Sequence, residues 1–284
     1  KELANKKSIK KWGSPAYLPL LVIMLVGFVA PLCIIFKMSL FDPGFTLEHY
    51  VIFFKNETYV QIYLRTFKTA FTVTLGCLLL GYPLSFFLAT CVKEKTANYL
   101  RIFIVIPFWV SILIRTFAWK VILSNTGVIN SFLLDQGWIE KPLSLLYNSF
   151  AVHVSMIHIL LPFMVLTLYG VMKGISANYY NAALNLGARP MKAFWQVYFP
   201  MSFSGILSGT LMVFIMALGF YITPSILGGS NDTMLPVVIE MQVNRALNWN
   251  FASAMAVILL LTTSIIVVIY TEVLGADDFG GVTP

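Results

Sequence analysis

The chain has 284 residues, of which 58% are hydrophobic and 11% are charged, and its mean hydropathy is +0.82. Because a soluble domain needs about a quarter of its residues charged to cover its surface, this composition excludes a soluble globular protein and indicates an integral membrane protein surrounded by lipid. The formal net charge of +7 could suggest a nucleic-acid partner, but the positive residues gather in a few loops between apolar segments, which argues for membrane orientation and against nucleic acid.

Six apolar segments are long enough to cross the hydrocarbon core of a membrane, which takes about 20 residues of helix. They cover residues 17–37, 66–92, 100–123, 148–172, 201–225 and 251–272. The first follows a basic N-terminus, yet it is longer than a signal-peptide core and lacks a small-residue cleavage site. We therefore predict an all-α, polytopic membrane protein with six transmembrane helices in a single domain, residues 1–284.

The positive residues predict which loops face the cytoplasm. Eleven of the 19 lie before the first segment, in or beside the loop 93–99, and in the loop 173–200: Lys1, Lys6, Lys7, Lys10, Lys11, Lys93, Lys95, Arg101, Lys173, Arg189 and Lys192. The positive-inside rule places these loops in the cytoplasm and, with six crossings, both chain termini as well. Aromatic residues at the expected membrane boundaries agree with this orientation: Trp12 and Tyr17 inside, and Trp119, Trp138 and Trp249 outside.

Turn and breaker residues predict smaller features. The outward segment "FDPGFTLEHYVIFF" (41–54) predicts a turn followed by a short amphipathic helix at the membrane surface. Gly205 and Gly209, four residues apart, predict a close approach between two helices. Proline or glycine interrupts four segments, which indicates either kinked helices in a tight bundle or a bundle that changes shape. These interruptions are "GCLLLGYP" (76–83), "IPFW" (106–109), "LLPF" (160–163) and "GFYITP" (219–224).

The loop 173–200 is polar, rich in small residues and helical in character. "SANYYNAALNL" favours a short helix from about residue 177, with Gly187 where a left-handed residue ends a helix. Pro190 suits the first turn of a second helix, and Pro200 is expected to end it. A helix of about 11 residues is roughly 16 Å long, too short to cross a membrane. The loop therefore predicts a helix–turn–helix protrusion on the cytoplasmic face.

The surface of this protrusion points to a partner. Ala182 and Ala183 are adjacent positions with methyl side chains, which permit close approach of another backbone, as a helix lying in a groove requires. Phe194, Val197 and Phe199 are expected to pack the second helix back on the bundle. An ordinary interfacial loop helix would explain the same residues without any partner.

The segment "NAALNLGARPMKAFWQVYFP" (181–200) resembles the EAA loop of the permease subunits of bacterial ABC importers. That loop reads E-A-A, three residues, G, nine residues, an aliphatic residue, any residue, an aliphatic one and P. The spacing is met here, but Asn181 replaces the glutamate of the family, so a charged contact becomes a neutral one. The resemblance implies that the following residues couple the chain to an ATPase: Asn181, Ala182, Ala183, Gly187, Arg189, Val197 and Pro200.

The rest of the chain resembles the permeases of spermidine/putrescine importers. The matching segments are "LGYPLSFFLA" (80–89), "IPFWVSILIRTFAWKVIL" (106–123), "GVINSFLL" (127–134), "LLPFMVLTLY" (160–169) and "ITPSILGG" (222–229). The resemblance implies a type I ABC importer permease fold in the bacterial inner membrane. It also implies a second, different permease, two ATP-binding subunits and an extracytoplasmic solute-binding protein as partners.

No cofactor site is expected in this chain. Gly76 and Gly81 have the glycine spacing of a phosphate-binding loop, but Tyr82 and Pro83 replace its lysine and hydroxyl residue. Three cysteines lack the spacing of a metal site or a disulfide framework: Cys33, Cys77 and Cys91. The chain is therefore predicted to be non-catalytic, and the resemblance assigns ATP and Mg²⁺ to the ATPase subunits.

Four residues are candidates for the translocation pathway: Trp109, Arg115, Phe220 and Tyr221. Arg115 is expected about 12 Å inside the outer end of the third segment, where a charge needs a cavity or a polar partner. It either lines the pathway or is held by polar neighbours. The aromatic residues either line the pathway or pack the bundle. His158 is interpreted as a packed histidine rather than a proton carrier.

The substrate is predicted to be a small polar solute, with a polyamine first. No Asp or Glu lies deep in a segment, and Gly219 and Ser225 stand where related polyamine permeases often carry an acid. The same machinery importing an amino-acid derivative, an opine, a phosphonate or a similar solute is the alternative. A secondary transporter would need more ionisable residues in the membrane than this chain has, which disfavours that class. An intramembrane enzyme would need carboxylates near His153 and His158, and the sequence has none there.

Overall fold

The computed structural model of the protein describes residues 18–274. In this part the chain is helical apart from turns and one short hairpin, whose two strands have two residues each. This confirms the all-α prediction. The N-terminal lysines, Trp12, Tyr17 and both chain ends lie outside the described residues. Five helical stretches in the described part are long and apolar enough to cross a membrane: Leu21–Leu40, Glu57–Cys91, Ile112–Asp135, Ser149–Gly174 and Trp249–Val273. A sixth is the bent pair Pro190–Met201 and Phe203–Leu218.

Four of the six predicted spans are confirmed. The first is formed by α2 (Leu18–Met24), a π-helical turn η1 (Leu25–Val29) and α3 (Ala30–Leu40). The second is α5 (Glu57–Phe86) with the π-helical turn η2 (Phe87–Cys91), and it begins nine residues before the predicted start at residue 66. The fourth is α9 (Ser149–Gly174), which runs through Pro162 without a break, and the sixth is α16 (Trp249–Leu274).

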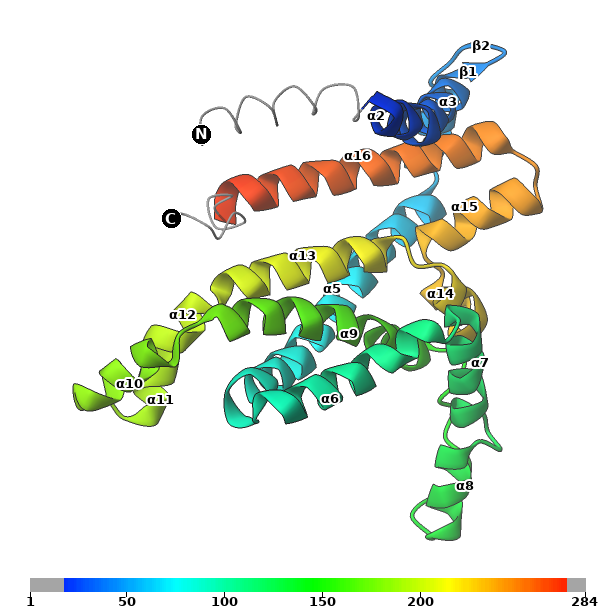
Figure 1. Ribbon diagram of the computed structural model, residues 1–284. Coiled ribbons are helices and arrows are strands. Elements are labelled where there is room, and N and C mark those ends of the chain that lie inside the picture. Colours follow the sequence, from blue (N-terminus) through cyan, green and yellow to red (C-terminus); the bar gives the residue numbers. More distant parts are fainter. Residues whose placement is uncertain (1–17, 275–284) are drawn as a thin grey trace, which may run out of the picture. The chain divides into compact units, whose positions relative to one another are not determined.

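The predicted third span, 100–123, is wrong as a single straight helix. The chain forms α6 (Glu94–Val105), a 3₁₀ turn η3 (Ile106–Trp109) and then α7 (Ile112–Leu123). Val110 is extended, with φ −91° and ψ 129°, and the Ser111 hydroxyl accepts a hydrogen bond from the Leu113 N–H at 3.3 Å, so a new helix starts there. Pro107 cannot donate to a preceding carbonyl, which weakens the helix at this point. Figure 1 shows α7 and α8 (Val128–Asp135) running across the direction of α6 and α9.

The predicted fifth span, 201–225, also ends early. Its helix α13 covers Phe203–Leu218, and Gly219 to Tyr221 separate it from α14 (Ile222–Leu227). The breaker segment "GFYITP" therefore interrupts the helix that was predicted for the fifth span. Glycine at the C-terminal end and Pro224 in the first turn of the next helix both favour this break.

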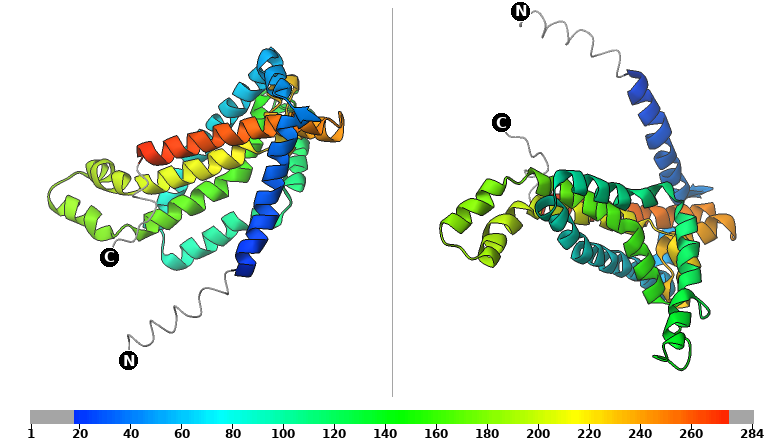
Figure 2. Two further views of the ribbon diagram at one scale, coloured as in Figure 1. Left: turned by 90° about the horizontal axis from the view of Figure 1, so that it is seen from above. Right: turned by 60° about the horizontal axis from the view of Figure 1, so that its bottom comes forward.

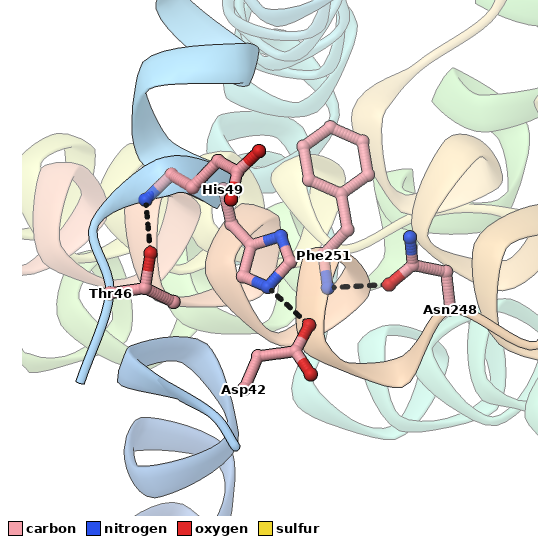
Figure 3. Close-up of polar contacts among 6 residues, drawn as sticks. Asp42, Thr46, His49, Asn248 and Phe251 are labelled. Atoms are coloured by element: carbon pink, nitrogen blue, oxygen red, sulfur yellow. Dashed lines mark hydrogen bonds and ion pairs between the residues drawn. The ribbon is translucent and has the colours of Figure 1, made fainter. Parts of the chain in front are cut away.

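The described residues form two units, of which the first contains residues 18–56 and 239–262. It holds the hairpin of β1 (Phe41–Asp42) and β2 (Gly44–Phe45), then α4 (Glu48–Lys55), which confirms the predicted turn and short helix at 41–54. The His49 ring contacts Asp42 at 3.2 Å and lies 6.2 Å from the Phe251 ring on α16 (Figure 3). Thr46 and Asn248 accept hydrogen bonds from backbone N–H groups of the helices that follow them (Figure 3).

The second unit contains residues 57–238 and 263–274, and its core lies among α5, α9 and α13. Four residues of α9 at intervals of four are fully buried: Met156, Leu160, Met164 and Leu168. They pack against Ala70, Val73 and Cys77 of α5 and Val213 and Ala217 of α13. Because lipid is as apolar as these side chains, close packing rather than escape from water holds the helices together. This bundle is the platform from which the loop 173–200 projects.

The prediction that Gly205 and Gly209 permit a close approach is confirmed. A Cβ atom at Gly205 would lie 2.9 Å from the Cβ of Val171 on α9, and one at Gly209 would lie 2.9 Å from the sulfur of Met164. The Val171 Cβ is fixed to its backbone and cannot rotate away. The two helices can therefore pack at this distance only with glycine at position 205.

We expect Gly205→Ala to lower the melting temperature of the purified protein. Overpacking costs about 1–3 kcal/mol, more than the roughly 1 kcal/mol that alanine adds in helix propensity. Gly170→Ala is the matched control, because a Cβ there meets nothing within 4 Å. Intrinsic tryptophan fluorescence during heating measures both. A melting temperature for Gly205→Ala equal to or above that of Gly170→Ala would contradict the packing explanation.

Candidate functional site in the loop 173–200

The loop contains the predicted helix–turn–helix. Its first helix, α10 (Ala177–Asn185), begins after Ser176, whose hydroxyl accepts from the Asn178 N–H at 3.3 Å. At its other end Gly187 has φ +85°, the left-handed conformation predicted for it. The Gly187 N–H donates to the Leu184 carbonyl at 2.9 Å and the Ala188 N–H to the Ala183 carbonyl at 3.1 Å. This pair of bonds is a Schellman motif, which closes the helix and fixes the direction of the chain after it.

The second helix begins at Pro190, as predicted. It comprises α11 (Pro190–Ala193), a π-helical turn η4 (Phe194–Tyr198) and α12 (Phe199–Met201). The prediction that Pro200 ends this helix is confirmed to within one residue, because the helix ends at Met201 and the chain then bends by 57° into α13. Proline is tolerated in the first turn of α12, where its missing N–H costs least.

The protrusion is exposed. Figure 1 and both views of Figure 2 show α10 and α11 beyond the ends of α9 and α13. No residue of α10 is buried, and Asn181, Ala182, Gly187 and Arg189 are exposed. Four large apolar side chains of the loop are also more than half exposed: Tyr179, Leu186, Met191 and Trp195. A helix with alanines at its surface and exposed apolar neighbours is a surface suited to a protein partner.

The base of the loop is packed by aromatic rings. Phe194 and Phe199, predicted to pack the loop on the bundle, do so against Tyr82 of α5, with ring centroids 6.4 and 5.8 Å apart. Val197 is half-buried, whereas Pro200 is exposed. A cleft of about 420 Å³ lies beside these rings, between α5 and the two loop helices. Its lining residues are Tyr82, Pro83, Phe86, Tyr180, Pro190, Met191 and Phe194.

Sequence reasoning missed Tyr82 and Ser202, whose hydroxyl groups are 2.8 Å apart. The motif "LGYP" drew attention as a helix breaker, and nothing in the sequence linked its tyrosine to a serine 120 residues away. Ser202 is fully buried and stands at the bend between α12 and α13. These two residues therefore join α5 to the loop at its base.

The structure places the four pathway candidates in different surroundings. Trp109 is 89% exposed and lines a groove of about 600 Å³ with Arg101 of α6 and Ile106 of η3. Phe220 is half-buried and packs against the core, whereas Tyr221 beside it is 46% exposed. Because α7 is a separate helix, the depth of about 12 Å predicted for Arg115 no longer follows.

His158 of α9 makes a polar contact with α7, near which Arg115 also lies. The Trp119 indole N–H donates to Nδ1 of His158 at 3.2 Å, which supports a packed histidine. Arg115 Nε and Nη1 are buried and have no hydrogen-bond partner among the residues that the structure describes. Within residues 18–274 no group of three or more His, Cys, Asp or Glu side chains is placed to hold a metal ion.

Comparison with known proteins identifies the family. Residues 81–276 match the model of the binding-protein-dependent transport system inner membrane component. The spermidine/putrescine transport system permease protein PotB of Salmonella typhimurium (strain SL1344) is 33% identical over 226 residues, which cover 80% of this chain and 78% of that protein. PotB of Escherichia coli (strain K12) is 32% identical over 226 residues, covering 80% and 82%.

The fold agrees with a solved structure. A crystal structure of a bacterial ABC transporter involved in the import of the acidic polysaccharide alginate contains a chain with a TM-score of 0.72 and 17% identity, covering 96% of this chain and 98% of that one. At this identity the likeness concerns the fold alone. The chain therefore belongs to the binding-protein-dependent transport system inner membrane components, the non-catalytic permease subunits of bacterial ABC importers, and has their type I fold.

Proposed function

We propose that this chain pairs with a second, different permease to form the pathway of an ATP-driven importer for a small polar organic solute, with a polyamine such as spermidine or putrescine as the first candidate. The observation that carries the proposal is the exposed protrusion at 173–200 on a permease of this family. The named function of the PotB relatives supports the polyamine. A solute-binding protein delivers the substrate from outside, and both chain termini lie in the cytoplasm.

The protrusion couples the permease to its ATPase subunits. Two partner ATPase subunits bind ATP and Mg²⁺, and α10 rests in a cleft of one of them. The exposed Asn181 and Ala182 contact that cleft, and the Schellman motif at Gly187 holds α10 at the required angle. When the ATPases close on ATP, the two permeases are drawn together and their bundles change from inward- to outward-facing. ATP can drive this change because it binds the two states with different affinity.

The pathway recognises a cation through aromatic rings. Trp109 and Tyr221 expose ring surface, and a cation over such a ring gains about 0.5–2 kcal/mol. The helices α9, α13 and α14 contain no Asp or Glu. Carboxylates for a polyamine would then come from the second permease or from the binding protein. Phe220 supports Tyr221 from the core side, and Arg115 borders the pathway as its positive residue.

One cavity favours the alternative substrates. It has a volume of about 460 Å³ and lies at the end of the bundle predicted to face outward, beside Arg65 and Lys68 of α5 and His153 of α9. Asp232 is the one carboxylate on its wall, and Ser149 donates a hydrogen bond to it. Two cations and one anion suit a solute that carries a carboxylate or phosphonate as well as an amine, such as an amino-acid derivative or an opine.

Calorimetry and uptake decide between these substrates. In calorimetry, the binding protein that assembles with this chain should bind spermidine or putrescine. Proteoliposomes that contain the full importer and enclose ATP should take up the same polyamine when the binding protein is present outside. Liposomes with ADP are the control and should take up none. Binding of an opine or phosphonate with no heat from polyamines would support the alternative, whereas uptake without ATP would contradict an ABC importer.

A further inference from the structure

The corner between the loop 173–200 and α13 is built around one residue. Ser202 lies where the helix Pro190–Met201 meets α13 at 57°, and it is fully buried. Its N–H is within hydrogen-bond distance of the carbonyls of Tyr198 and Phe199, at 3.0 and 3.1 Å. Its own carbonyl accepts from Gly205 and Ile206, at 3.1 and 3.2 Å. Ser202 thus belongs to the hydrogen bonding of both helices, and any change of the bend must move it.

A side chain of α5 holds this corner. The Ser202 hydroxyl donates to the Phe199 carbonyl at 2.8 Å and lies 2.8 Å from the Tyr82 hydroxyl. A serine hydroxyl has a single proton to donate, and when that proton is given to the Phe199 carbonyl, the Tyr82 hydroxyl is the donor to Ser202. The bond is therefore directional, from α5 to the corner. Breaking the bond removes the hydrogen-bond partner of the half-buried Tyr82 hydroxyl, whereas Ser202 keeps its own bond to Phe199.

Aromatic contacts place the Tyr82 hydroxyl where it can make this bond. The Tyr82 ring packs against those of Phe194 and Phe199, at centroid distances of 6.4 and 5.8 Å. One turn further along α5, the Phe86 ring contacts the edges of Phe194 and Tyr198 at 5.3 and 5.0 Å. The rings of α5 and of the loop thus form one packed group, and the Tyr82–Ser202 hydroxyl pair lies beside it at the bend between the loop helix and α13.

We propose that the bond between Tyr82 and Ser202, which we name the hinge contact, positions the loop so that its ATP-driven displacement moves α5 rather than merely changing the 57° bend. The inference rests on the proposed coupling of the loop to an ATPase. With the hinge contact intact, the corner moves as one body with α5. Without it, the loop moves with the ATPase but α5 does not move with the loop, so ATP is hydrolysed without transport.

Tyr82→Phe tests the hinge contact because it removes one hydroxyl and keeps the ring. The full importer is reconstituted in proteoliposomes, and ATP hydrolysis and substrate uptake are measured in the same vesicles. We expect the number of substrate molecules transported per ATP to fall about three- to tenfold, the range that corresponds to the net contribution of one hydrogen bond. The rate of ATP hydrolysis should stay close to that of the wild type, which a merely misfolded variant would not achieve.

The chain offers a matched control in Tyr198. Its hydroxyl is buried and has no hydrogen-bond partner in the described part of the chain. Tyr198→Phe therefore removes the same atom from the same group of rings without breaking a bond, and should keep the wild-type transport per ATP. Ser202→Ala should reproduce the effect of Tyr82→Phe, and the double variant should be no worse than either single one.

Each outcome separates the hinge contact from the proposed function. Wild-type transport per ATP in both Tyr82→Phe and Ser202→Ala would overturn the hinge contact while leaving the ATPase coupling in place. An equal loss in Tyr198→Phe would also overturn it, because the effect would then follow the polarity of the rings and not the bond. Absence of ATP-dependent uptake in the wild type would overturn the proposed function, and the hinge contact with it.

Discussion

Replacing Ala182 by arginine is expected to abolish ATP-driven uptake while the chain still folds and inserts. Ala182 is exposed on α10, a helix without a buried residue, so the longer side chain meets no part of this chain's core. In the proposed complex it would enter the cleft of the ATPase and place an uncompensated charge in the interface. Such a charge costs about 3–5 kcal/mol, which lowers the affinity at least about 100-fold.

Ala177→Arg is the matched control for this prediction. It makes the same change on the same helix at an exposed position five residues away, and at 100° per residue that position points to another side of α10. Co-purification of the ATPase with tagged permease measures assembly, and uptake in proteoliposomes measures transport. We expect both to be lost in Ala182→Arg and retained in Ala177→Arg. Normal assembly of Ala182→Arg would show that α10 does not enter the ATPase at this face.

Replacing Gly187 by valine is expected to lower uptake about tenfold or more. The φ of +85° at this position costs a residue with a side chain about 1–2 kcal/mol, and a β-branched side chain more. A Cβ there would meet nothing within 4 Å, so the effect comes from the backbone conformation and not from a clash. To avoid the strained conformation the chain would leave the Schellman motif, and α10 would lose its angle to α11.

Gly187→Asn separates backbone conformation from loss of glycine as such. Asparagine adopts the left-handed conformation at low cost and ends helices in the same motif. Uptake by Gly187→Asn should therefore stay within about threefold of the wild type, a range set by the small cost of this conformation for asparagine. If asparagine and valine lowered uptake equally, the left-handed turn would not be what positions α10. Measurement of ATPase co-purification in both variants shows whether the loss arises at assembly.

The predictions from sequence succeeded where the cause is local. The length of an apolar run decides whether a helix can cross the membrane, and four of the six predicted spans agree with the structure. Gly187 and Pro190 act on their own backbone, so the turn at the end of α10 and the start of α11 could be predicted from residue type alone. The spacing from Ala182 to Pro200 likewise identified the family that the comparisons confirm.

The predictions failed where the direction of a helix depends on its neighbours. The segments 100–123 and 201–225 both contain breakers, but a proline inside an apolar segment kinks some helices and ends others. Pro162 lies within the continuous helix α9, whereas the chain breaks after Pro107. After Pro107 the backbone becomes extended at Val110, and Ser111 then caps the start of the separate helix α7.

The amino-acid sequence alone determined that this protein lies in a membrane, carries an exposed helical loop and belongs among the importer permeases. These properties follow from composition, from the backbone limits of glycine and proline, and from the spacing of a short motif. The tertiary structure alone decided that Val171 faces Gly205 and that Tyr82 meets Ser202. Such contacts join residues far apart in the chain, and packing among whole helices, which no local pattern encodes, brings them together.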